Sequence, residues 1–517
     1  MLEPAASEPF AGVSETHSSV VFFVGDHAYK LKKPVSLGFL DFSSQAAREA
    51  ACRRETELNR RFAPDVYLGV AEVRAPSGES CEHLVVMRRM PGNRRLSSLI
   101  RARAPVAGPL RQVARALAVQ HAVAARGPQI SEQGSRDALR SRWRASFAQI
   151  RRIGARLPDA AELLEVAEVG PTERLAEWFL AGRAPLFNAR IDEGRVVDGH
   201  GDLLADDIFC LDDGPRILDC LEFDDRLRWL DGLDDAAFLA MDLDRLGAPE
   251  LAERFTGWYT EFAADPAPPS LRHHYLAYRA FVRVKVAAIR AAQGDLYAAA
   301  EVRQLAAMTL RHLRAGAVTL VLIGGMPGTG KSMLAGTLAD RLGCTLLSSD
   351  RIRKELAGLP PEAPAPAPFG AGIYATSWTE RTYGELLHRA GALLELGESV
   401  IIDASWIARG HRAAAAAVAE KGAADLVQLR CTAPPALAAQ RMSSRRGDAS
   451  DADPTIAAHM AATKDPWPDA ITLDTGGTGS PGSLDESADP VRRALDAIRP
   501  YGPEHVWRPT RPYMLPG

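Results

Sequence analysis

The chain has 517 residues, of which 46% are hydrophobic and 25% are charged, and its formal net charge is −3. Because this length exceeds one ordinary hydrophobic core, we expect about two to four domains, and the average composition excludes wholesale disorder. The nearly balanced charge argues against a broad nucleic-acid-binding surface, so a nucleic acid partner is possible but not favoured.

The predicted elements begin with β-strands. Residues 17–34 are apolar on both sides of a Gly-Asp turn, which predicts a β-hairpin. A long helix follows, for which Ser43 or Ser44 is the expected cap. Two further strands are predicted at residues 67–74 and 83–89. The first part of the chain is therefore rich in β-structure.

Helical patterns cover the chain from there to about residue 313. The clearest lie at residues 110–125, 136–156 and 172–181, and a loop with short strands interrupts them over residues 199–223. A small β-rich segment, a helical segment and a loop between them predict one bilobal α+β domain over residues 1–314.

Strands and helices alternate in the last third of the chain. Short apolar runs predict strands with helices between them, which implies a parallel sheet. The predicted strands are residues 318–323, 345–348, 399–402 and 426–430. We therefore expect an α/β domain with a parallel sheet over residues 315–500, followed by a C-terminal tail over residues 501–517.

A phosphate-binding pattern directly follows the first of these strands. Residues 325–332 read Gly-Met-Pro-Gly-Thr-Gly-Lys-Ser, which matches GxxxxGK[ST]. Its glycines let backbone N–H groups turn towards phosphate oxygens, and the next helix directs its positive end there. Lys331 would reach the β and γ phosphates, and the Ser332 hydroxyl would bind Mg²⁺. We expect ATP to contact Gly325, Met326, Pro327, Gly328, Thr329, Gly330, Lys331, Ser332 and Met333.

Two acidic residues follow strand ends in the same predicted domain. Asp350 comes after the second strand and Asp403 ends the third, where ligands bind in open α/β sheets. Asp403 could hold Mg²⁺ through water or contact the substrate. The alternatives are an Asp350 that caps a helix and an Asp403 that only caps a turn.

These residues resemble the pattern of P-loop kinases related to polynucleotide kinase and the zeta-toxin group, over residues 318–465. The resemblance implies that Asp350 activates the acceptor hydroxyl and that Arg353 positions the acceptor. Arg441 and Arg445, one helical turn apart, resemble the lid arginines of that family and would close over phosphates. A solvated arginine face is the alternative.

A second candidate site lies in the first predicted domain. Lys30 lies in a hairpin strand, and His-Gly-Asp at residues 200–202 opens a loop that ends at Asp207. Here the chain resembles the aminoglycoside phosphotransferase and kinase-like superfamily, whose catalytic loop reads HGDxxxxN. The resemblance spans most of residues 17–250.

This resemblance implies a role for each matching residue. Lys30 would hold the α and β phosphates, Glu55 would orient this lysine from the first long helix, and Asp202 would be the catalytic base. A carboxylate near the acceptor hydroxyl can orient it and take its proton, and phosphoryl transfer otherwise needs mainly positioning and charge neutralisation. Residues 85–92 resemble the hinge strand that receives adenine on backbone groups.

The chain also departs from the family pattern at its metal ligands. Asp207 stands where the family has a metal-binding Asn. The metal-binding Asp of the family aligns best with Glu222, and Asp219 is the alternative. A carboxylate in place of an amide keeps metal binding plausible, but it adds charge and removes a hydrogen-bond donor.

Simpler interpretations compete with a phosphate site in the first domain. Lys30 could be a solvated lysine in a surface cluster with Lys32 and Lys33, and the His-Gly-Asp segment could be an ordinary turn. The hairpin contains one glycine, Gly25, so no glycine-rich lid over the phosphates is apparent. The first domain would then bind nucleotide, substrate or a partner without catalysis.

The order of motifs resembles bacterial fusions of a phosphotransferase-like domain with a P-loop, AAA-type kinase domain. We predict an ATP- and Mg²⁺-dependent phosphotransferase that moves the γ-phosphate to a hydroxyl of a small-molecule acceptor, whose identity the sequence does not give. One alternative is a polynucleotide or toxin-like kinase regulated by the first domain. The other is an ATP-sensing interaction protein with a pseudokinase first domain. The sequence carries no information on oligomeric state.

Cysteine and apolar patterns bear on the compartment. The six cysteines are scattered with no CxxC pair, which indicates free thiols and a reducing environment. The chain start lacks the basic and apolar regions of a signal peptide, and no apolar run approaches the roughly 18 residues that span a bilayer. We therefore expect a cytoplasmic protein without a membrane partner.

Overall fold

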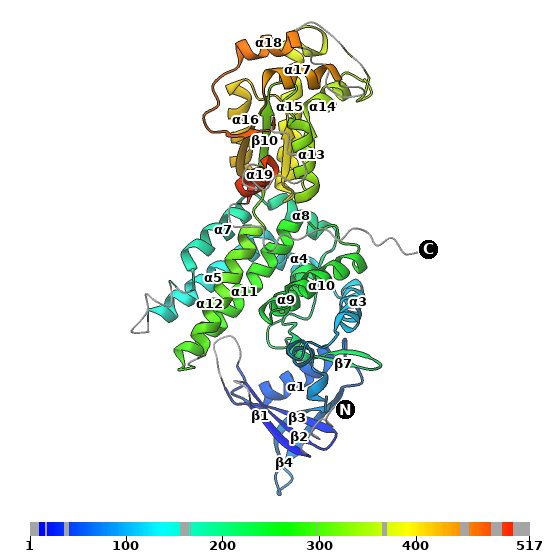
Figure 1. The fold of residues 1–517 in the computed structure, drawn as a ribbon. Helices are drawn as coiled ribbons and strands as arrows, with labels where there is room; N and C mark the ends of the chain where they lie inside the picture. The colour runs from blue at the N-terminus through cyan, green and yellow to red at the C-terminus, as the bar shows by residue number, and fades with distance from the viewer. Residues whose placement is uncertain are drawn as a thin grey trace. The chain divides into compact units, whose positions relative to one another are not determined.

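Figure 1 shows the fold of the chain in a computed structural model. The structure describes residues 10–15, 18–35, 41–155, 165, 167–295, 297–363, 365, 370–444, 454–476 and 489–499. The chain forms two compact units: the first comprises Met1–Gly170, Phe187–Ala267 and Tyr275–Leu310, and the second comprises Pro171–Leu186, Pro268–His274 and Arg311–Gly517. Two short internal pieces of the predicted first domain, together with residues 311–314, thus belong to the second unit, and the domain limits at residues 314 and 500 stay predictions. The predicted tail over residues 501–517 lies outside the described residues.

The first unit begins with a five-stranded antiparallel sheet in the order β1-β2-β3-β5-β4. Its strands are β1 (Ala11–Glu15), β2 (Ser19–Val24), β3 (His27–Lys32), β4 (Tyr67–Arg74) and β5 (Ser80–Arg88). β2 and β3 form the predicted hairpin, and Lys30 of β3 is paired with Val21 on one side and Val85 on the other. The sequence does not predict β1, because its run Ala-Gly-Val-Ser-Glu is short, mostly exposed and lies at the sheet edge.

Helix α1 (Gln45–Asn59) packs on this sheet. Ser44, one of the two predicted caps, accepts a hydrogen bond from the N–H of Ala47 at 3.2 Å, which satisfies a free donor of the first turn. The buried apolar core between them consists of Ala28, Cys52, Ala63, Val66, Tyr67, Val85 and Met87. Because β3 and α1 are both anchored in this core, Lys30 and Glu55 project from fixed elements.

The rest of the first unit is mainly helical. Its helices are α2 (Leu96–Arg101), α3 (Ala107–Val123), α4 (Pro128–Gln133), α5 (Arg136–Gly154), α9 (Gly232–Arg245), α10 (Pro249–Phe262) and most of α8 (Ala184–Asp192), α11 (Pro269–Ala292) and α12 (Ala298–Ala315). Two antiparallel ribbons flank the predicted catalytic loop: β6 (Val196–Asp198) with β9 (Trp229–Asp231), and β7 (Ile208–Leu211) with β8 (Gly214–Ile217). Stacked and tilted rings of Trp143, Phe147 and Phe281 join α5 to α11.

The second unit contains a five-stranded parallel sheet in the order β11-β12-β10-β13-β14. Its strands are β10 (Thr319–Gly325), β11 (Thr345–Ser348), β12 (Val400–Asp403), β13 (Asp425–Thr432) and β14 (Ile471–Asp474). The middle strand, β10, is buried along almost its whole length, as expected where both faces of a parallel sheet are covered. The four predicted strands are present. The sequence does not predict β14, because its run Ile-Thr-Leu-Asp is short and half polar.

Helices alternate with the strands of the second unit. They are most of α7 (Val169–Ala181), α13 (Lys331–Leu342), α14 (Ser349–Leu356), α15 (Thr376–Glu395), α16 (Arg409–Lys421), α17 (Pro435–Ser444), α18 (Pro454–Thr463) and α19 (Pro490–Ile498). The predicted architecture is therefore confirmed: an α+β part is followed by an α/β part with a parallel sheet. Among the described residues, no helix has the length and hydrophobicity needed to cross a membrane.

Candidate active sites

A cleft of about 870 Å³ lies in the first unit, and a cleft of this size can hold a nucleotide and a small acceptor. The antiparallel sheet and the two residues after β5 contribute Val21, Phe23, Ala28, Lys30, Lys32, Met87, Arg88, Arg89 and Met90. The loops contribute Asp202, Asp206, Asp207, Phe209, Leu218, Asp219, Leu221 and Glu222. The cleft thus brings together the predicted phosphate-binding lysine, the predicted base, the candidate metal ligands and part of the predicted hinge at residues 85–92.

Lys30 lies between two carboxylates. Its Nζ is 2.9 Å from Oε1 of Glu55 on α1 and 2.6 Å from Oδ1 of Asp219. Burial opposes the positive charge, but the carboxylates of Asp219 and Glu55 outweigh it and hold the pKa of Lys30 well above its ordinary value. Because the Lys30 side chain is only 14% exposed, its interpretation as a solvated surface lysine is wrong.

Lys32 is a second buried lysine of this cleft. It lies two residues after Lys30 on β3 and therefore on the same face of the sheet. Its Nζ is 2.5 Å from Oε2 of Glu55 and forms a short ion pair with Glu222. The Lys32 side chain is 2% exposed, so its predicted place in a surface cluster is wrong. Both candidate metal ligands pair with a lysine, but the Asp219 side chain is 49% exposed and the Glu222 side chain is 10% exposed, so Asp219 is the more accessible to a metal ion.

Asp219 has a backbone conformation that is rare for a residue with a side chain. Its φ of 62° lies in the left-handed region, and such strain costs about 1–3 kcal/mol and clusters at functional sites. Its N–H donates to the Tyr67 hydroxyl at 3.1 Å, and the N–H of Cys220 donates to Oδ1 of Asn59 at 2.8 Å. Nε2 of His200 lies 2.9 Å from the carbonyl oxygen of Leu218, the residue before Asp219. These contacts hold the strained segment in place.

The loop that begins at His200 is fixed by α9. Asp235 of α9 accepts hydrogen bonds from the N–H groups of His200 and the next residue at 2.6 and 2.9 Å, and it lies 3.0 Å from Nε2 of His121. Burial opposes ionisation of Asp235, but His121 and His200 lower its pKa. Asp242 of the same helix accepts from the N–H of Ala205 at 2.9 Å. The sequence does not single out Asp235 and Asp242. Acidic residues within an otherwise apolar helical run nevertheless indicate a structural or functional role for such side chains.

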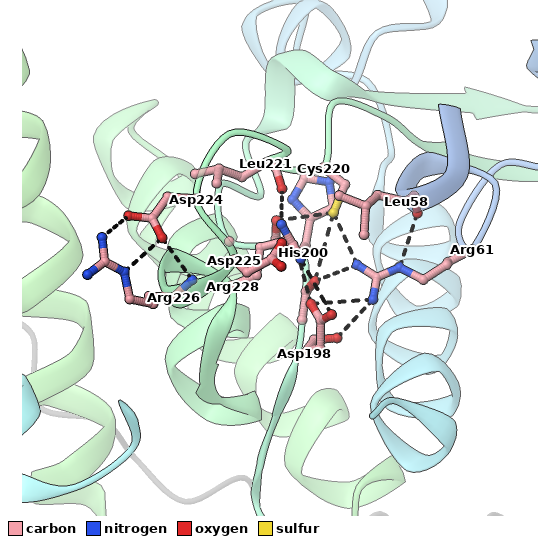
Figure 2. Close-up of polar contacts among 12 residues, drawn as sticks. Leu58, Arg61, Asp198, His200, Cys220, Leu221, Asp224, Asp225, Arg226 and Arg228 are labelled. Atoms are coloured by element: carbon pink, nitrogen blue, oxygen red, sulfur yellow. Dashed lines mark hydrogen bonds and ion pairs between the residues drawn. The ribbon is translucent and has the colours of Figure 1, made fainter. Parts of the chain in front are cut away.

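Arg61 ties the segment after α1 to the start of this loop, and Arg228 ties the start of the loop to Leu221 (Figure 2). Arg61 donates to the carbonyl oxygens of Asp198 and Gly199 at 3.1 and 2.8 Å. The fully buried Arg228 donates to Oδ1 of Asp198 at 2.9 Å and to the carbonyl oxygen of Leu221 at 2.8 Å. The catalytic loop is therefore held in a fixed position relative to α1.

The two acids of the predicted catalytic loop hold protons more tightly than usual. Burial raises the pKa of Asp202 to about 6. Burial, Asp219 and Asp202 together raise the pKa of Asp207 well above its ordinary value.

The acidic side of the cleft fits Mg²⁺, which prefers hard oxygen ligands. Asp207 and Asp219 both line the cleft. In the part of the chain that the structure describes, no group of three or more His, Cys, Asp or Glu side chains forms a ready-made metal site. A nucleotide site needs fewer protein ligands to the metal, because Mg²⁺ there binds one or two carboxylates together with phosphate oxygens. Asp207, in its ionised form, and Asp219 are the residues that would hold the ion.

Serines border the cleft where no glycine-rich lid is apparent. Ser14 of β1, Ser18, and Ser19 of β2 line the cleft, and their hydroxyl groups can donate to phosphate oxygens. These serines lie where β1 leads into β2, before the β2–β3 hairpin, and the sequence does not single them out because it does not predict β1.

In the second unit, the phosphate-binding loop follows the middle strand β10. Its glycines have positive φ values of 144°, 81° and 77° at Gly325, Gly328 and Gly330. A Cβ on Gly328 would lie 2.4 Å from the carbonyl oxygen of Ala438, so a side chain has no room there. The Thr329 hydroxyl donates to the carbonyl oxygen of Met326 at 2.7 Å. Helix α13 begins at Lys331, which places Ser332 and Met333 in its first turn.

Asp350 and Asp403 lie at the same edge of the parallel sheet. Asp403 ends β12, where it pairs in register with Ile323 of β10 and Ser348 of β11. The carboxyl ends of three neighbouring strands therefore meet next to the phosphate-binding loop. Asp350 lies in the first turn of α14, whose N-cap is Ser348, so the interpretation of Asp350 as the helix cap is wrong.

Arg353 lies on the buried face of α14. It is 6% exposed and donates to the carbonyl oxygen of Ile373 at 2.9 Å and to the Thr379 hydroxyl at 3.2 Å. Its guanidinium also lies over the ring of Tyr374, with its Cζ 5.0 Å from the ring centroid. The predicted acceptor-positioning arginine is thus held by the segment that leads into α15.

Arg441 of α17 lies beside the phosphate-binding loop. Its Nη2 donates to the carbonyl oxygen of Thr475 at 2.9 Å. Its Nη1 is buried, has no hydrogen-bond partner in the described part of the chain, and lies 3.5 Å from where a Cβ on Gly330 would be. A phosphate oxygen would satisfy such a donor. Arg445, the other predicted lid arginine, lies outside the described residues.

The whole chain has relatives among mycobacterial proteins. It is 42% identical over 474 residues to "Uncharacterized protein Rv2004c" of Mycobacterium tuberculosis and to "Uncharacterized protein Mb2027c" of Mycobacterium bovis. The matches cover 92% of this chain and 94% of each relative. The chain belongs to the family of these mycobacterial proteins. Because the matches span nearly the whole length, members of this family share both parts of the chain.

Within this mycobacterial family, the second unit carries a recognisable domain. A family model described as an AAA domain matches residues 320–465. The match contains the phosphate-binding loop, Asp350, Asp403 and Arg441. The predicted AAA-type domain in the last third of the chain is therefore confirmed.

Some solved structures resemble parts of the chain. A choline/ethanolamine kinase family protein from Mesorhizobium loti is 17% identical and covers 60% of this chain and 93% of its own, with a TM-score of 0.37. A sugar kinase from Janibacter sp. HTCC2649 is 22% identical and covers 35% of this chain and 94% of its own, with a TM-score of 0.24. Similarity this low does not by itself establish a shared fold or function.

Proposed function

We propose that the chain is an ATP- and Mg²⁺-dependent phosphotransferase with one kinase site in each unit. In the first unit, the γ-phosphoryl group of ATP would move to a hydroxyl of a small-molecule acceptor. The observation that carries this proposal is the placement of Lys30, held between Glu55 and Asp219, in the same cleft as Asp202. This arrangement combines phosphate binding, metal binding and a base, which are the main requirements of phosphoryl transfer.

The first cleft suggests a role for each of these residues. Lys30 would hold the α and β phosphates, with Glu55 keeping its amine in place. Asp207 and Asp219 line the cleft and would hold Mg²⁺, which would neutralise part of the phosphate charge. Asp202 would orient the acceptor hydroxyl and take its proton while the acceptor oxygen bonds to the γ-phosphorus and ADP leaves. A base in this position argues against a first unit that only senses ATP.

The second unit would bind a second ATP at its phosphate-binding loop. Lys331 and Ser332 begin α13 and would contact phosphate and Mg²⁺, respectively. Arg441 has a free buried donor beside the loop that would bind phosphate. Asp403 and Asp350 lie at the same sheet edge, where a metal ligand and a base for the acceptor are needed.

The test is ADP release with a panel of neutral, acidic and basic hydroxyl compounds and oligonucleotides. We expect Lys30→Ala to remove turnover at the first site, Lys331→Ala to remove it at the second, and the double variant to remove both. Lys33→Ala is the matched control, because Lys33 follows β3 but pairs with the exposed Glu15 at 2.5 Å. Acceptor-dependent turnover in the double variant would show that neither site is catalytic. Oligonucleotide turnover that depends on Lys331 would support the polynucleotide kinase alternative.

A further inference from the structure

The helix α11 forms a basic side of the first cleft. Arg283, Val286 and Arg290 line the cleft, and their spacing of i, i+3 and i+7 places them in one stripe along the helix. The opposite side of the cleft carries the buried lysines and acids of the proposed nucleotide site. This stripe is therefore placed to bind a ligand other than the nucleotide.

Arg279, one turn before Arg283, fixes the rotation of α11. It donates to both carboxylate oxygens of Asp234 on α9, at 2.7 and 2.6 Å. Both side chains are buried, and a bidentate pair of this kind permits little movement. The orientation of the stripe towards the cleft is therefore set by a buried contact.

Arg283 differs from its neighbour in the stripe. Arg290 is engaged by Asp295 at 2.5 Å and by Glu301 at 2.8 Å. Arg283 forms no hydrogen bond or ion pair with any residue that the structure describes. Arginine is charged at every pH at which proteins fold, so Arg283 presents to the cleft a charged guanidinium whose N–H donors have no partner among the described residues.

Arg283 lies on the side of the cleft where Asp202 is. Burial raises the pKa of Asp202, and Arg283 is the cation that most lowers it. Lys30 instead contacts Asp219, with its Nζ 2.6 Å from Oδ1 of that residue. Lys30 is therefore placed for the nucleotide phosphates, and Arg283 is placed near the base, where an acceptor would bind.

We propose that Arg283 binds a carboxylate or phosphate group of the acceptor, so that the acceptor is an acidic hydroxyl compound. This inference rests on the proposed phosphotransfer in the first cleft. The planar guanidinium matches both anions with paired hydrogen bonds. A cationic acceptor would be repelled by the same group, so Arg283 selects for one charge and against the other.

The first test measures charge preference among acceptors that share one ring. The full chain carries Lys331→Ala, so that turnover reports on the first site alone. The acceptors are glucose, which is neutral, glucuronate, glucose 6-phosphate and the cationic glucosamine. We expect kcat/KM to be at least about tenfold higher for an acidic member than for glucose, with Arg283→Gln removing that preference and Arg283→Lys keeping part of it. Glucuronate and glucose 6-phosphate distinguish a carboxylate from a phosphate.

The second test measures binding and does not depend on turnover. A non-hydrolysable ATP analogue saturates both nucleotide sites, and calorimetry then follows inorganic phosphate or acetate. We expect one of these anions to bind at least about tenfold more weakly to Arg283→Gln than to the unsubstituted chain. Arg115→Gln is the control, because Arg115 is an exposed residue of α3 outside the cleft lining. The control should leave anion binding unchanged.

The outcomes separate this inference from the proposed function. If Asp202→Asn leaves the turnover of every acceptor unchanged, the proposed function fails. If Asp202→Asn abolishes turnover while Arg283→Gln changes neither charge preference nor anion binding, only the role of Arg283 fails. Failure of the unsubstituted chain to bind either anion would also overturn that role. The role would also be overturned if Arg283→Gln bound the ATP analogue more weakly but bound the anions as well as the unsubstituted chain does. Arg283 would then bind the nucleotide.

Discussion

Lys30 and Asp219 are 189 residues apart in the chain, and yet Nζ of Lys30 lies 2.6 Å from Oδ1 of Asp219. The pair joins the proposed phosphate-binding lysine to the proposed metal ligand. Each group neutralises the other, and phosphate and Mg²⁺ would replace these partners with ones of the same charge. Glu55 remains as the second partner of Lys30, so the lysine would keep its position during this exchange.

The first prediction separates the two candidate metal ligands. We expect Asp219→Asn to lower kcat of the first site on the order of 100-fold and to raise the Mg²⁺ concentration needed for half-maximal rate. Glu222→Gln should leave the Mg²⁺ dependence unchanged, because the Glu222 side chain is only 10% exposed and pairs with the buried Lys32. Titration of ADP release with Mg²⁺, in a chain that carries Lys331→Ala, measures the effect of each substitution. If Glu222→Gln raised the required Mg²⁺ concentration and Asp219→Asn did not, Glu222 would be the ligand.

The second prediction concerns the pH dependence of the first site. Asp202 must be ionised to take a proton, and burial raises its pKa to about 6. We therefore expect kcat/KM to be steady above that pH and to fall about tenfold per unit well below it. A pH series of ADP release from the Lys331→Ala chain measures this. An acid limb near the ordinary pKa of an exposed aspartate would argue against Asp202 as the base.

The third prediction concerns the support of the catalytic loop by α9. Asp235 is fully buried and accepts two backbone hydrogen bonds besides its contact with His121. We expect Asp235→Ala to destabilise the first unit by about 3–5 kcal/mol, because buried donors lose their partner. Urea unfolding of the first unit measures the change. Asp212→Ala, at a side chain that is 96% exposed, should change stability little.

The fourth prediction uses two glycines of the second unit. Gly328 has a φ of 81°, and a Cβ there would lie 2.4 Å from the carbonyl oxygen of Ala438. We expect Gly328→Ala to displace the loop and to weaken ATP-analogue binding at this site at least about tenfold. Gly336→Ala on α13 is the matched control, because a Cβ there meets nothing within 4 Å. Calorimetry in a chain that carries Lys30→Ala measures the affinity of each variant for the ATP analogue. Equal affinities of Gly328→Ala and Gly336→Ala would contradict this prediction.

Local patterns predict the elements and the residues that depend on them. The phosphate-binding loop follows from the chemistry of one continuous segment, and Lys30, Glu55 and Asp202 follow from a family resemblance. The analysis misses contacts that only tertiary packing creates. The strand period places Lys32 beside Lys30, but nothing local shows that Glu55 and Glu222 bury it.

The edges of the molecule and its distant contacts are also poorly predicted. β1 and β14 are short edge strands with weak apolar patterns, and the loss of β1 hides the serines beside the cleft. The choice between Asp219 and Glu222 depends on how exposed each carboxylate stays beside its lysine partner, and those lysines are 189 and 190 residues away. Arg283 looks like any helical arginine until the pairing of Arg279 fixes the rotation of α11.

The most direct test of the central claim is detection of a phosphorylated acceptor by mass spectrometry in the chain that carries Lys331→Ala. The account predicts that this chain still phosphorylates an acceptor and that adding Asp202→Asn abolishes the product, since Asp202 is the base in the first cleft. Equal amounts of product with and without Asp202→Asn would contradict it.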